Sequence, residues 1–302
     1  AVVLADALID EISQPYNLGE LEIKIGTCVG VVVSDDATNA DELFKRADLA
    51  LYEAKRMGPG SASVFKVHMQ QQLTEKRSFE ADLQLALQNN EMEVYYQPQM
   101  LTKTREICGF EALLRWTHPV RGRVPPSDFI PVAERTGLIH SLGKWAMDTA
   151  CQEAKSWKGG LKVAINLSPV QFHSTTLIQN VVNALEKSGL DAHRLELEIT
   201  ESVLLNRSEQ TLETLAKLKD VGIKIAMDDF GTGYSSLGNL RGVPFDKIKI
   251  DQSFLRDVAT DTDALAIVEF VVGMAKSLRM TTIAEGIETQ EQFDCMSQLG
   301  CD

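Results

Sequence analysis

The stretch LELEIT at residues 195–200 gives the clearest indication of the fold. Its two leucines and its isoleucine alternate with Glu196, Glu198 and Thr200, which is the period-two pattern of a β-strand. The apolar face of such a strand packs under helices, so the polar face points the other way. The stretch therefore predicts a strand that directs carboxylates toward the inside of a curled sheet.

Further stretches along the chain have the composition of strands, and helical periodicity separates the later ones. The predicted strands are 93–100, 107–116, 161–168, 195–200, 223–230, 247–251 and 281–287, and the predicted helices are 140–157, 175–188, 208–220 and 262–279. Alternation of strands and helices indicates a parallel sheet. The first two strands are too close in sequence for a parallel crossover, so we expect an antiparallel hairpin there.

This order of elements predicts an α/β fold, a (β/α)8 TIM-like barrel with an antiparallel first strand. Seven strands are present, and the eighth strand is missing from the chain. We expect the natural protein to continue beyond Asp302 with that closing strand, after a helix over 289–299. A doubly wound open sheet is the alternative, but no glycine-rich dinucleotide loop supports it.

Polar alternates in other strands should point inward as well. Within residues 161–168 the inward residues are Asn166 and Ser168, and within 247–251 they are Lys249 and Asp251. Residues Glu111, Leu113 and Arg115 share one face of the second strand. Most of these side chains lie near the carboxyl ends of their strands, where the active sites of barrels are found.

Carboxylates gathered at a barrel mouth repel one another, and divalent cations relieve that repulsion. Oxygen ligands without Cys or His favour Mg²⁺ or Mn²⁺ over Zn²⁺, and the adjacent Asp228 and Asp229 could hold two ions. Each residue also has an ordinary interpretation. Glu111 could be an ion-paired strand residue, Asp228 and Asp229 a helix cap, Lys249 a surface lysine, and Glu285 with Glu288 a cap for the next helix. Together they favour a functional site.

The composition excludes several classes of protein. The 302 residues are 44% hydrophobic and 24% charged, with a net charge of −13, which is typical of a soluble globular protein and disfavours binding to long nucleic acids. No membrane-length apolar run and no signal peptide are visible. Five cysteines without a C-x-x-C pair suggest a reducing compartment, so we expect a cytoplasmic location, with membrane anchoring upstream in the full-length protein left open.

The first 68 residues have a different pattern. Residues 21–33 predict a strand, residues 39–58 predict a helix capped by Asn39 and ended by Gly58, and SASVFK predicts a short strand. The stretches IGTCVGVVV and RADLALYEAKRMG resemble the C-terminal part of a GGDEF (diguanylate cyclase) domain, a partial α+β segment. The signature loop is absent from the sequence, so we assign no cyclase activity. Residues 69–75 are expected to be a linker, within a linker helix over 67–90.

Residues 76–302 resemble an EAL domain, the family of cyclic-di-GMP phosphodiesterases. The matching stretches are YYQP, FEALLRW, PPSDFIPVAE, INLSPVQF, LEITES, MDDFGTGYSSL, FDKIKID and IAEGIET, in the order found in the family. The basic turn HPVRGR at 118–123 is interpreted as a solvated loop, and the three tryptophans as packing residues.

The resemblance implies a role for individual residues. One metal ion would be held by Glu111, Asn166, Glu198 and Asp228, and a second by Asp228 and Asp229. Lys249 would hold or orient the attacking water, Glu285 would act as the general base, and Glu201 would brace the loop around 230–234. The substrate-binding residues would be Gln97, Leu113, Arg115 and Glu288, the last as a supporting residue.

The resemblance implies metal-dependent hydrolysis of cyclic di-GMP to the linear dinucleotide pGpG, with two Mg²⁺ or Mn²⁺ ions. The alternative is a catalytically inactive receptor that binds cyclic di-GMP and signals without turnover, and a weaker one is a domain that only mediates assembly. Expected partners are cyclic di-GMP, a second copy in a homodimer formed near the DDFGTG loop, and upstream sensory or GGDEF domains of the same protein.

Overall fold

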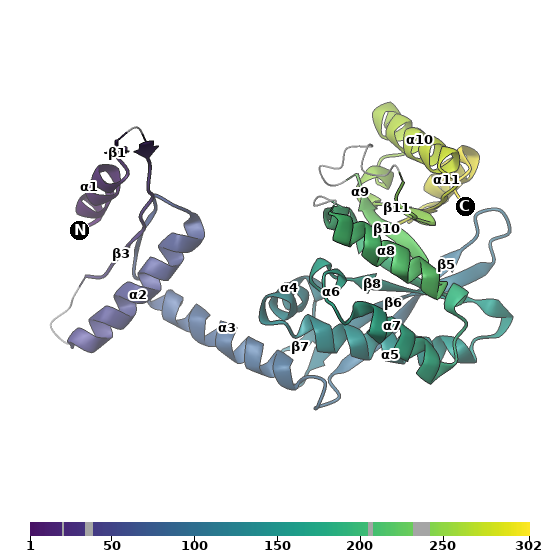
Figure 1. The fold of residues 1–302 in the computed structure, drawn as a ribbon, viewed down its shortest axis with the longest axis horizontal. Coiled ribbons are helices and arrows are strands. Elements are labelled where there is room, and N and C mark those ends of the chain that lie inside the picture. The colour runs from purple at the N-terminus through teal and green to yellow at the C-terminus, as the bar shows by residue number, and fades with distance from the viewer. Residues whose placement is uncertain (20, 34–38, 205–207, 232–241) are drawn as a thin grey trace. The chain divides into compact units, whose positions relative to one another are not determined.

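The computed structural model describes the chain except residues 20, 34–38, 205–207 and 232–241 (Figure 1). Two compact units divide the chain, Ala1–Asp82 and Leu83–Asp302. We describe each unit by itself. Among the described residues, no helix combines the length and the apolar character that a membrane span requires. All five cysteines are free thiols.

The first unit is small and mixed in secondary structure. Its elements are α1 (Val2–Ile12), β1 (Tyr16–Leu18), β2 (Leu21–Ile23), β3 (Val29–Val31), α2 (Ala40–Met57), β4 (Ala62–Val64) and most of α3 (Val67–Leu85). The side chain of Asn39 accepts a hydrogen bond from the Glu42 N–H at 2.9 Å, and Gly58 follows the last residue of α2, so both predicted ends of this helix are confirmed. Helix α3 runs through the expected linker at 69–75.

The prediction of one strand over 21–33 is wrong, because this segment contains two short strands that belong to two different sheets. Strand β2 pairs antiparallel with β1, whereas β3 pairs parallel with β4. Strand β3 also lies directly against α2. A Cβ atom at Gly30 would stand 2.4 Å from the Ala47 carbonyl oxygen, so this position requires glycine.

The second unit is built on one curled sheet. Its strands are β5 (Met92–Met100), β6 (Ile107–His118), β7 (Gly122–Val124), β8 (Lys162–Leu167), β9 (Leu195–Thr200), β10 (Lys224–Phe230), β11 (Lys247–Ile250) and β12 (Thr281–Ala284). The order across the sheet is β12-β11-β10-β9-β8-β6-β5, with β7 paired to β6. Strands β5 and β6 are antiparallel, as predicted, and the strands from β6 through β8 to β12 are parallel neighbours.

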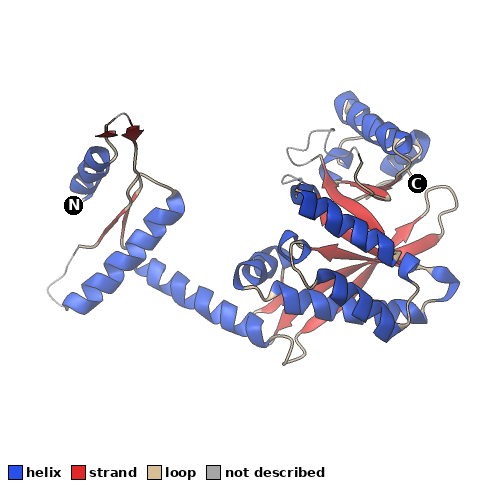
Figure 2. Cartoon of the chain, viewed as in Figure 1, coloured by secondary structure: helices blue, strands red, loops and turns tan. Residues whose placement is uncertain are grey.

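Helices connect the parallel strands and cover the sheet (Figure 2). They are α4 (Pro126–Thr136), α5 (Ile139–Ser156), α6 (Pro169–Phe172), α7 (Leu177–Ser188), α8 (Glu209–Val221), α9 (Gln252–Leu255), α10 (Thr262–Ser277) and α11 (Gln290–Leu299). Helix α4 was not predicted from the sequence, because its prolines argue against a helix. Pro126 occupies its first turn, where a missing N–H leaves no hydrogen bond unmade. Strand β7 was not predicted either. Residues 118–123 were interpreted as a loop, and this is wrong for Gly122 and Arg123, which pair with β6.

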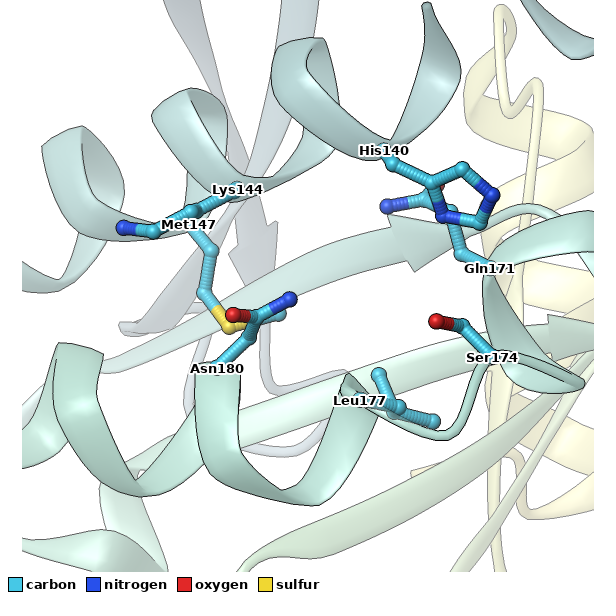
Figure 3. A pocket seen from close by; sticks show the side chains of 7 residues that line it. All are labelled: His140, Lys144, Met147, Gln171, Ser174, Leu177 and Asn180. Atoms are coloured by element: carbon cyan, nitrogen blue, oxygen red, sulfur yellow. The ribbon is translucent and has the colours of Figure 1, made fainter. Parts of the chain in front are cut away.

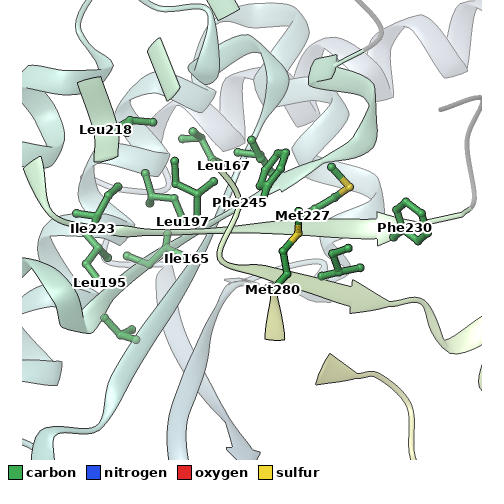
Figure 4. Close-up of a cluster of buried hydrophobic side chains, with 14 of the residues drawn as sticks. Ile165, Leu167, Leu195, Leu197, Leu218, Ile223, Met227, Phe230, Phe245 and Met280 are labelled. Carbon is green, nitrogen blue, oxygen red and sulfur yellow. The ribbon is translucent and has the colours of Figure 1, made fainter. Parts of the chain in front are cut away.

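The core lies between the apolar face of the sheet and the helices (Figure 4). Leu195, Leu197 and Ile199 of β9 are all buried there, with Ile225 and Ile248 from the neighbouring strands. This is the face that the alternation in LELEIT assigned to the helices. The opposite face of the same strands is therefore free to carry polar side chains.

Asp302 contacts strand β12 at one edge of the sheet and the turn between β5 and β6 at the other. The Asp302 carboxylate accepts the Thr282 N–H at 3.0 Å, and the Asp302 carbonyl oxygen accepts the Thr102 N–H at 2.9 Å. Asp302 thus lies between β12 and the end of the β5–β6 hairpin.

Asp246 joins three segments at the amino-terminal end of the sheet, away from the acids at the carboxyl ends. Its carboxylate accepts the Ile225 N–H at 2.9 Å, Lys219 at 2.6 and 2.8 Å, and Lys224 at 2.9 Å. Burial alone would raise the pKa of Asp246, but these hydrogen bonds lower it below its ordinary value. The ionised carboxylate therefore stabilises the packing of α8 and β10 against the start of β11.

We expect Asp246→Asn to lower the stability of the second unit by about 1–2 kcal/mol at neutral pH, the order of a charge-assisted hydrogen bond at a half-buried site. Because the pKa of Asp246 is lower in the folded than in the unfolded chain, its carboxylate stabilises the fold at pH values above the unfolded-state pKa near 3.8. This stabilisation is lost as the pH falls through the folded-state pKa. The difference between variant and wild type should therefore shrink below about pH 4. Urea titrations followed by tryptophan fluorescence report on this unit alone, since Trp116, Trp145 and Trp157 all lie in it. A difference that stays constant from pH 7 to pH 3 would contradict this role.

Candidate functional site

Adjacent parallel strands place a ring of charged side chains at their carboxyl ends. Strand β6 contributes Glu111, β9 contributes Glu198, β10 contributes Asp228 and β11 contributes Lys249. Glu285 follows β12 directly, where its N–H donates to the Ile250 carbonyl oxygen at 3.1 Å. The predicted strand over 281–287 ends at Ala284, so Glu285 lies in the connection and not in the strand.

The ammonium group of Lys249 is the centre of this ring. Its Nζ atom lies 2.6 Å from Glu198 Oε2, 2.6 Å from Glu285 Oε1, 3.0 Å from Asp228 Oδ1 and 3.4 Å from Glu111 Oε2. The Lys249 side chain is only 2% exposed. We call Lys249 and these four acids the Lys249 cluster. The ordinary interpretation of Lys249 as a surface lysine is therefore wrong.

Burial and mutual repulsion set the protonation of the Lys249 cluster. Burial alone would lower the pKa of Lys249, but the four carboxylates outweigh it and raise the pKa well above its ordinary value. Burial raises the pKa of Glu198, and the neighbouring Glu111 and Asp228 raise it further against the opposing charge of Lys249. Burial likewise raises the pKa of Glu285. The lysine thus stays charged, while Glu198 and Glu285 hold their protons more readily than ordinary carboxyl groups.

Asn166 and Asp229 lie beside the cluster. The Asn166 amide donates to Glu111 Oε1 at 2.7 Å. Asp229 has a φ of 54°, a left-handed conformation at a register shift between β10 and β11. Its N–H donates to Asp228 Oδ1 at 3.0 Å, and burial followed by the charge of Asp228 raises its pKa. Backbone strain of this kind is concentrated at functional sites.

Glu201 follows β9 in a short 3-10 turn and is buried. Its Oε2 atom accepts the Gly231 N–H at 3.2 Å, so it contacts the start of the segment that it was expected to brace. Residues 232–234 of that segment lie outside the described residues, and so does the end of the DDFGTG loop near which dimerisation is expected.

The chemistry of these ligands fits divalent cations. Carboxylate and amide oxygens are the groups that Mg²⁺ and Mn²⁺ prefer. Glu198 Oε1 is buried without a hydrogen-bond partner among the described residues, which leaves one acceptor available for a cation. In the described part of the chain, however, no three His, Cys, Asp or Glu side chains are arranged around a common metal position. The four acids converge on Lys249 instead.

The residues expected to bind substrate lie outside the Lys249 cluster. Gln97 pairs directly across from Glu111, on the same face of the β5–β6 hairpin, and is exposed. Leu113 and Arg115 follow Glu111 on that face. Glu288 is exposed, and its N–H donates to Gln292 Oε1 at 2.8 Å. Thr289 and Gln292 form the capping box of α11, so the interpretation of Glu285 and Glu288 as the helix cap is wrong.

A small cavity lies elsewhere in the second unit, between α5 and the segment of α6 and α7 (Figure 3). Its lining residues are His140, Lys144, Met147, Gln171, Ser174, Leu177 and Asn180. None of them belongs to the Lys249 cluster. The charged end of Lys144 is paired with Asp148 at 2.7 Å. The cavity thus brings no group of acids together, and the Lys249 cluster is the stronger candidate site.

Comparison with known protein families matches residues 80–302 to the family described as EAL domain and residues 1–61 to the family described as diguanylate cyclase, GGDEF domain. An uncharacterized signaling protein of Caulobacter vibrioides is 46% identical over 97% of this chain and 36% of its own length. The bifunctional diguanylate cyclase/cyclic di-GMP phosphodiesterase MucR of Pseudomonas aeruginosa is 38% identical over 100% of this chain and 45% of its own. The chain thus spans less than half the length of these relatives.

Among solved structures, the PaMucR phosphodiesterase in complex with c-di-GMP superimposes with a TM-score of 0.71 at 39% identity. The match covers 74% of this chain and 93% of that chain. Solved EAL domains have a TIM-like barrel, and the curled sheet described above is the corresponding part of it. The predicted fold class is confirmed.

We expect Lys249→Met to destabilise the second unit by about 3–5 kcal/mol, because it leaves several buried carboxylates without their counter-charge. Urea titrations in EDTA, followed by tryptophan fluorescence, measure this change. The matched control is Lys217→Met, which removes the same charge from an exposed pair with Glu213 and should leave the midpoint almost unchanged. Equal midpoints for Lys249→Met and wild type would show that the acids do not depend on this lysine.

Proposed function

The chain belongs to the EAL domain family, and from that membership we propose that it hydrolyses cyclic di-GMP to pGpG in a reaction that depends on divalent metal ions. The observation that carries the proposal is the Lys249 cluster, in which one buried ammonium contacts carboxylates from four segments of the sheet. Relatives named as cyclic di-GMP phosphodiesterases support it, among them MucR and NbdA of Pseudomonas aeruginosa.

The proposed reaction is the attack of water on one phosphodiester. A bond forms between the water oxygen and phosphorus, the bond from phosphorus to the 3′ oxygen breaks, and the leaving oxygen takes up a proton. Bound Mg²⁺ or Mn²⁺ would polarise the phosphate and favour ionisation of the attacking water. Glu111, Asn166, Glu198, Asp228 and Asp229 would hold these ions.

Glu285 and Lys249 would act on the attacking water. Among the four acids of the Lys249 cluster, Glu285 lies directly after a strand, whereas the other three lie within strands. Its raised pKa suits a group that accepts a proton. Lys249 donates to it at 2.6 Å and would fix the carboxylate and the water relative to each other. Glu201 would hold the loop after Asp229 through Gly231. Gln97, Leu113 and Arg115 would contact the dinucleotide, with Glu288 in support.

A receptor that binds cyclic di-GMP without turnover is the second candidate. The observation that favours it is that Lys249 already neutralises part of the charge of the acids. Incubation of the chain with cyclic di-GMP and Mg²⁺ or Mn²⁺, followed by chromatography, decides between the two. Metal-dependent formation of pGpG supports the enzyme, whereas binding without any pGpG supports the receptor.

We expect Glu285→Gln to lower turnover roughly 10²- to 10⁴-fold, because the amide keeps the shape of the side chain but cannot accept the proton. Binding of cyclic di-GMP should largely survive. Initial rates and isothermal titration separate the two effects. Glu291→Gln, an exposed position in the first turn of α11, is the matched control and should retain wild-type rates. Wild-type turnover in Glu285→Gln would remove this residue from the mechanism.

We expect the affinity for Mg²⁺ to rise with pH and binding to release protons. The pKa values of Glu198 and Asp229 are raised, so these groups keep their protons to higher pH than ordinary carboxyl groups, and the protons must leave before a cation binds. The rise should level off once the pH exceeds the raised values. Isothermal titration in buffers of different ionisation enthalpy counts the protons released.

Asp228→Asn should weaken Mg²⁺ binding and activity together, because this carboxylate is proposed to contact both ions. Asp220→Asn, at the end of α8, makes the same chemical change away from the cluster and should leave both unchanged. Mg²⁺ affinity that is independent of pH and of Asp228 would contradict a metal site at these residues.

A further inference from the structure

Three side chains converge at the rim of the sheet beyond Glu111, and no role has yet been given to two of them. They are Tyr95 of β5, Arg115 of β6 and Arg123 of β7. Tyr95 pairs across from Leu113, and Arg123 pairs across from Thr117. Since Glu111, Leu113, Arg115 and Thr117 are alternate residues of one strand, all these side chains lie on the face that carries Glu111.

Both arginines lie against the ring of Tyr95. The Arg123 Cζ atom is 4.9 Å from the ring centroid, and the Arg115 Cζ atom is 5.8 Å from it. Tyr95 is 45% exposed, and Arg123 is exposed. We call these three residues the Tyr95 cluster. Tyr95 and Arg123 are thus accessible to a ligand from solvent, whereas Arg115 is half-buried.

Within the described part of the chain, neither arginine of the Tyr95 cluster has an acidic partner. Among the described residues, no carboxylate oxygen lies within 4.0 Å of either guanidinium, although Glu93 pairs directly across from Arg115 in the hairpin. The Arg115 guanidinium donates a hydrogen bond to the neighbouring Leu114 carbonyl oxygen. In a chain with a net charge of −13, two arginines without a carboxylate partner in the described part of the structure indicate a place for an anionic or electron-rich ligand.

The Tyr95 cluster lies within reach of a dinucleotide bound at the acids. Leu113, the partner of Tyr95, is two residues from Glu111, or about 7 Å along the strand. Ala112 of β6 pairs with Ile165 of β8. Leu113 therefore lies beside Asn166, and the later residues of β6 extend past the carboxyl end of β8. A ligand with its phosphate at the Lys249 cluster would therefore place a base near Tyr95.

We propose that Arg123, held over Tyr95, reads a guanine base of the bound dinucleotide. The guanidinium is planar and can donate two parallel hydrogen bonds to the O6 and N7 atoms of guanine, the pairing by which arginine distinguishes guanine from the other bases. The Tyr95 ring orients the guanidinium and offers an aromatic surface for stacking. Arg123 is thus a specificity-determining residue and Tyr95 a positioning residue. The inference rests on the proposed binding of cyclic di-GMP.

The test is a binding cycle with two ligands and matched variants. The ligands are cyclic di-GMP and its 7-deazaguanine analogue, which lacks only the N7 acceptors. The proteins are the full chain, Arg123→Gln, Arg123→Lys and Tyr95→Leu, each in the Glu285→Gln background to suppress turnover. Arg121→Gln is the control, since it removes the same charge from the same turn. Isothermal titration gives the Kd of every pair.

We expect Arg123→Gln to weaken cyclic di-GMP binding roughly 5- to 150-fold, the range for one bidentate arginine–guanine contact. The parent chain, which carries Glu285→Gln alone, should bind the 7-deaza analogue more weakly than cyclic di-GMP. Arg123→Gln should bind the two ligands equally well. Arg123→Lys should lose most of the discrimination although it keeps the charge, and Tyr95→Leu should lose part of it. Arg121→Gln should behave as the parent chain does.

Two results would overturn the inference, and they are distinguishable from each other. If the parent chain and Arg123→Gln discriminate equally against the 7-deaza analogue, Arg123 contacts a phosphate or only supports the strands, while the proposed function stands. If the parent chain and the chain with Glu285 intact both fail to bind cyclic di-GMP, the proposed function itself is wrong. Thermal denaturation of each variant distinguishes a packing defect from the loss of a guanine contact. A packing defect lowers the Tm but leaves the ratio of the two Kd values unchanged.

Discussion

The burial of one lysine charge is the constraint on which the second unit depends. An ammonium removed from water is stable only if nearby groups of opposite charge and good geometry replace its hydration. Lys249 satisfies this with carboxylates at 2.6–3.4 Å that come from β6, β9, β10 and the connection after β12. These segments are distant in sequence, so the ion pairs hold the strands of the curled sheet in one register at their carboxyl ends.

The opposite end of the sheet uses the same principle with the charges reversed. There one carboxylate, Asp246, is surrounded by Lys219, Lys224 and the Ile225 N–H. The two ends differ in the balance of charge. Asp246 is paired with two lysines, and its pKa is lowered. The Lys249 cluster has four acids around one lysine, and the pKa values of Glu198 and Glu285 are raised. An excess of this kind is typical of sites that bind cations or move protons.

Period-two alternation predicted the sheet well because each strand has one face packed on helices. Strand 195–200 has the bounds predicted for it, and Glu198 and Lys249 lie on the predicted polar face. Alternation specifies a face but not a distance, so it could not show that the acids would contact Lys249. It also could not show the left-handed backbone of Asp229 or the pairing of β7, because both follow from contacts between strands. Arg123 was missed for the same reason, since three residues do not show a periodic pattern.

The charge of the site is the physical reason for metal ions in the proposed reaction. Four carboxylates and Asp229 face one ammonium, and this excess of acids would repel a dinucleotide that carries two phosphates. Divalent cations bound among the acids would reverse this potential at the centre. At the rim, Arg115 and Arg123 lie against Tyr95 without acidic partners among the described residues, and they supply positive charge that needs no metal. In the proposed function these two sources of charge would act at different parts of the ligand. The centre would attract the phosphate that reacts and the rim would contact the parts that do not, so that the protein would orient the ligand while the ions supported its reaction.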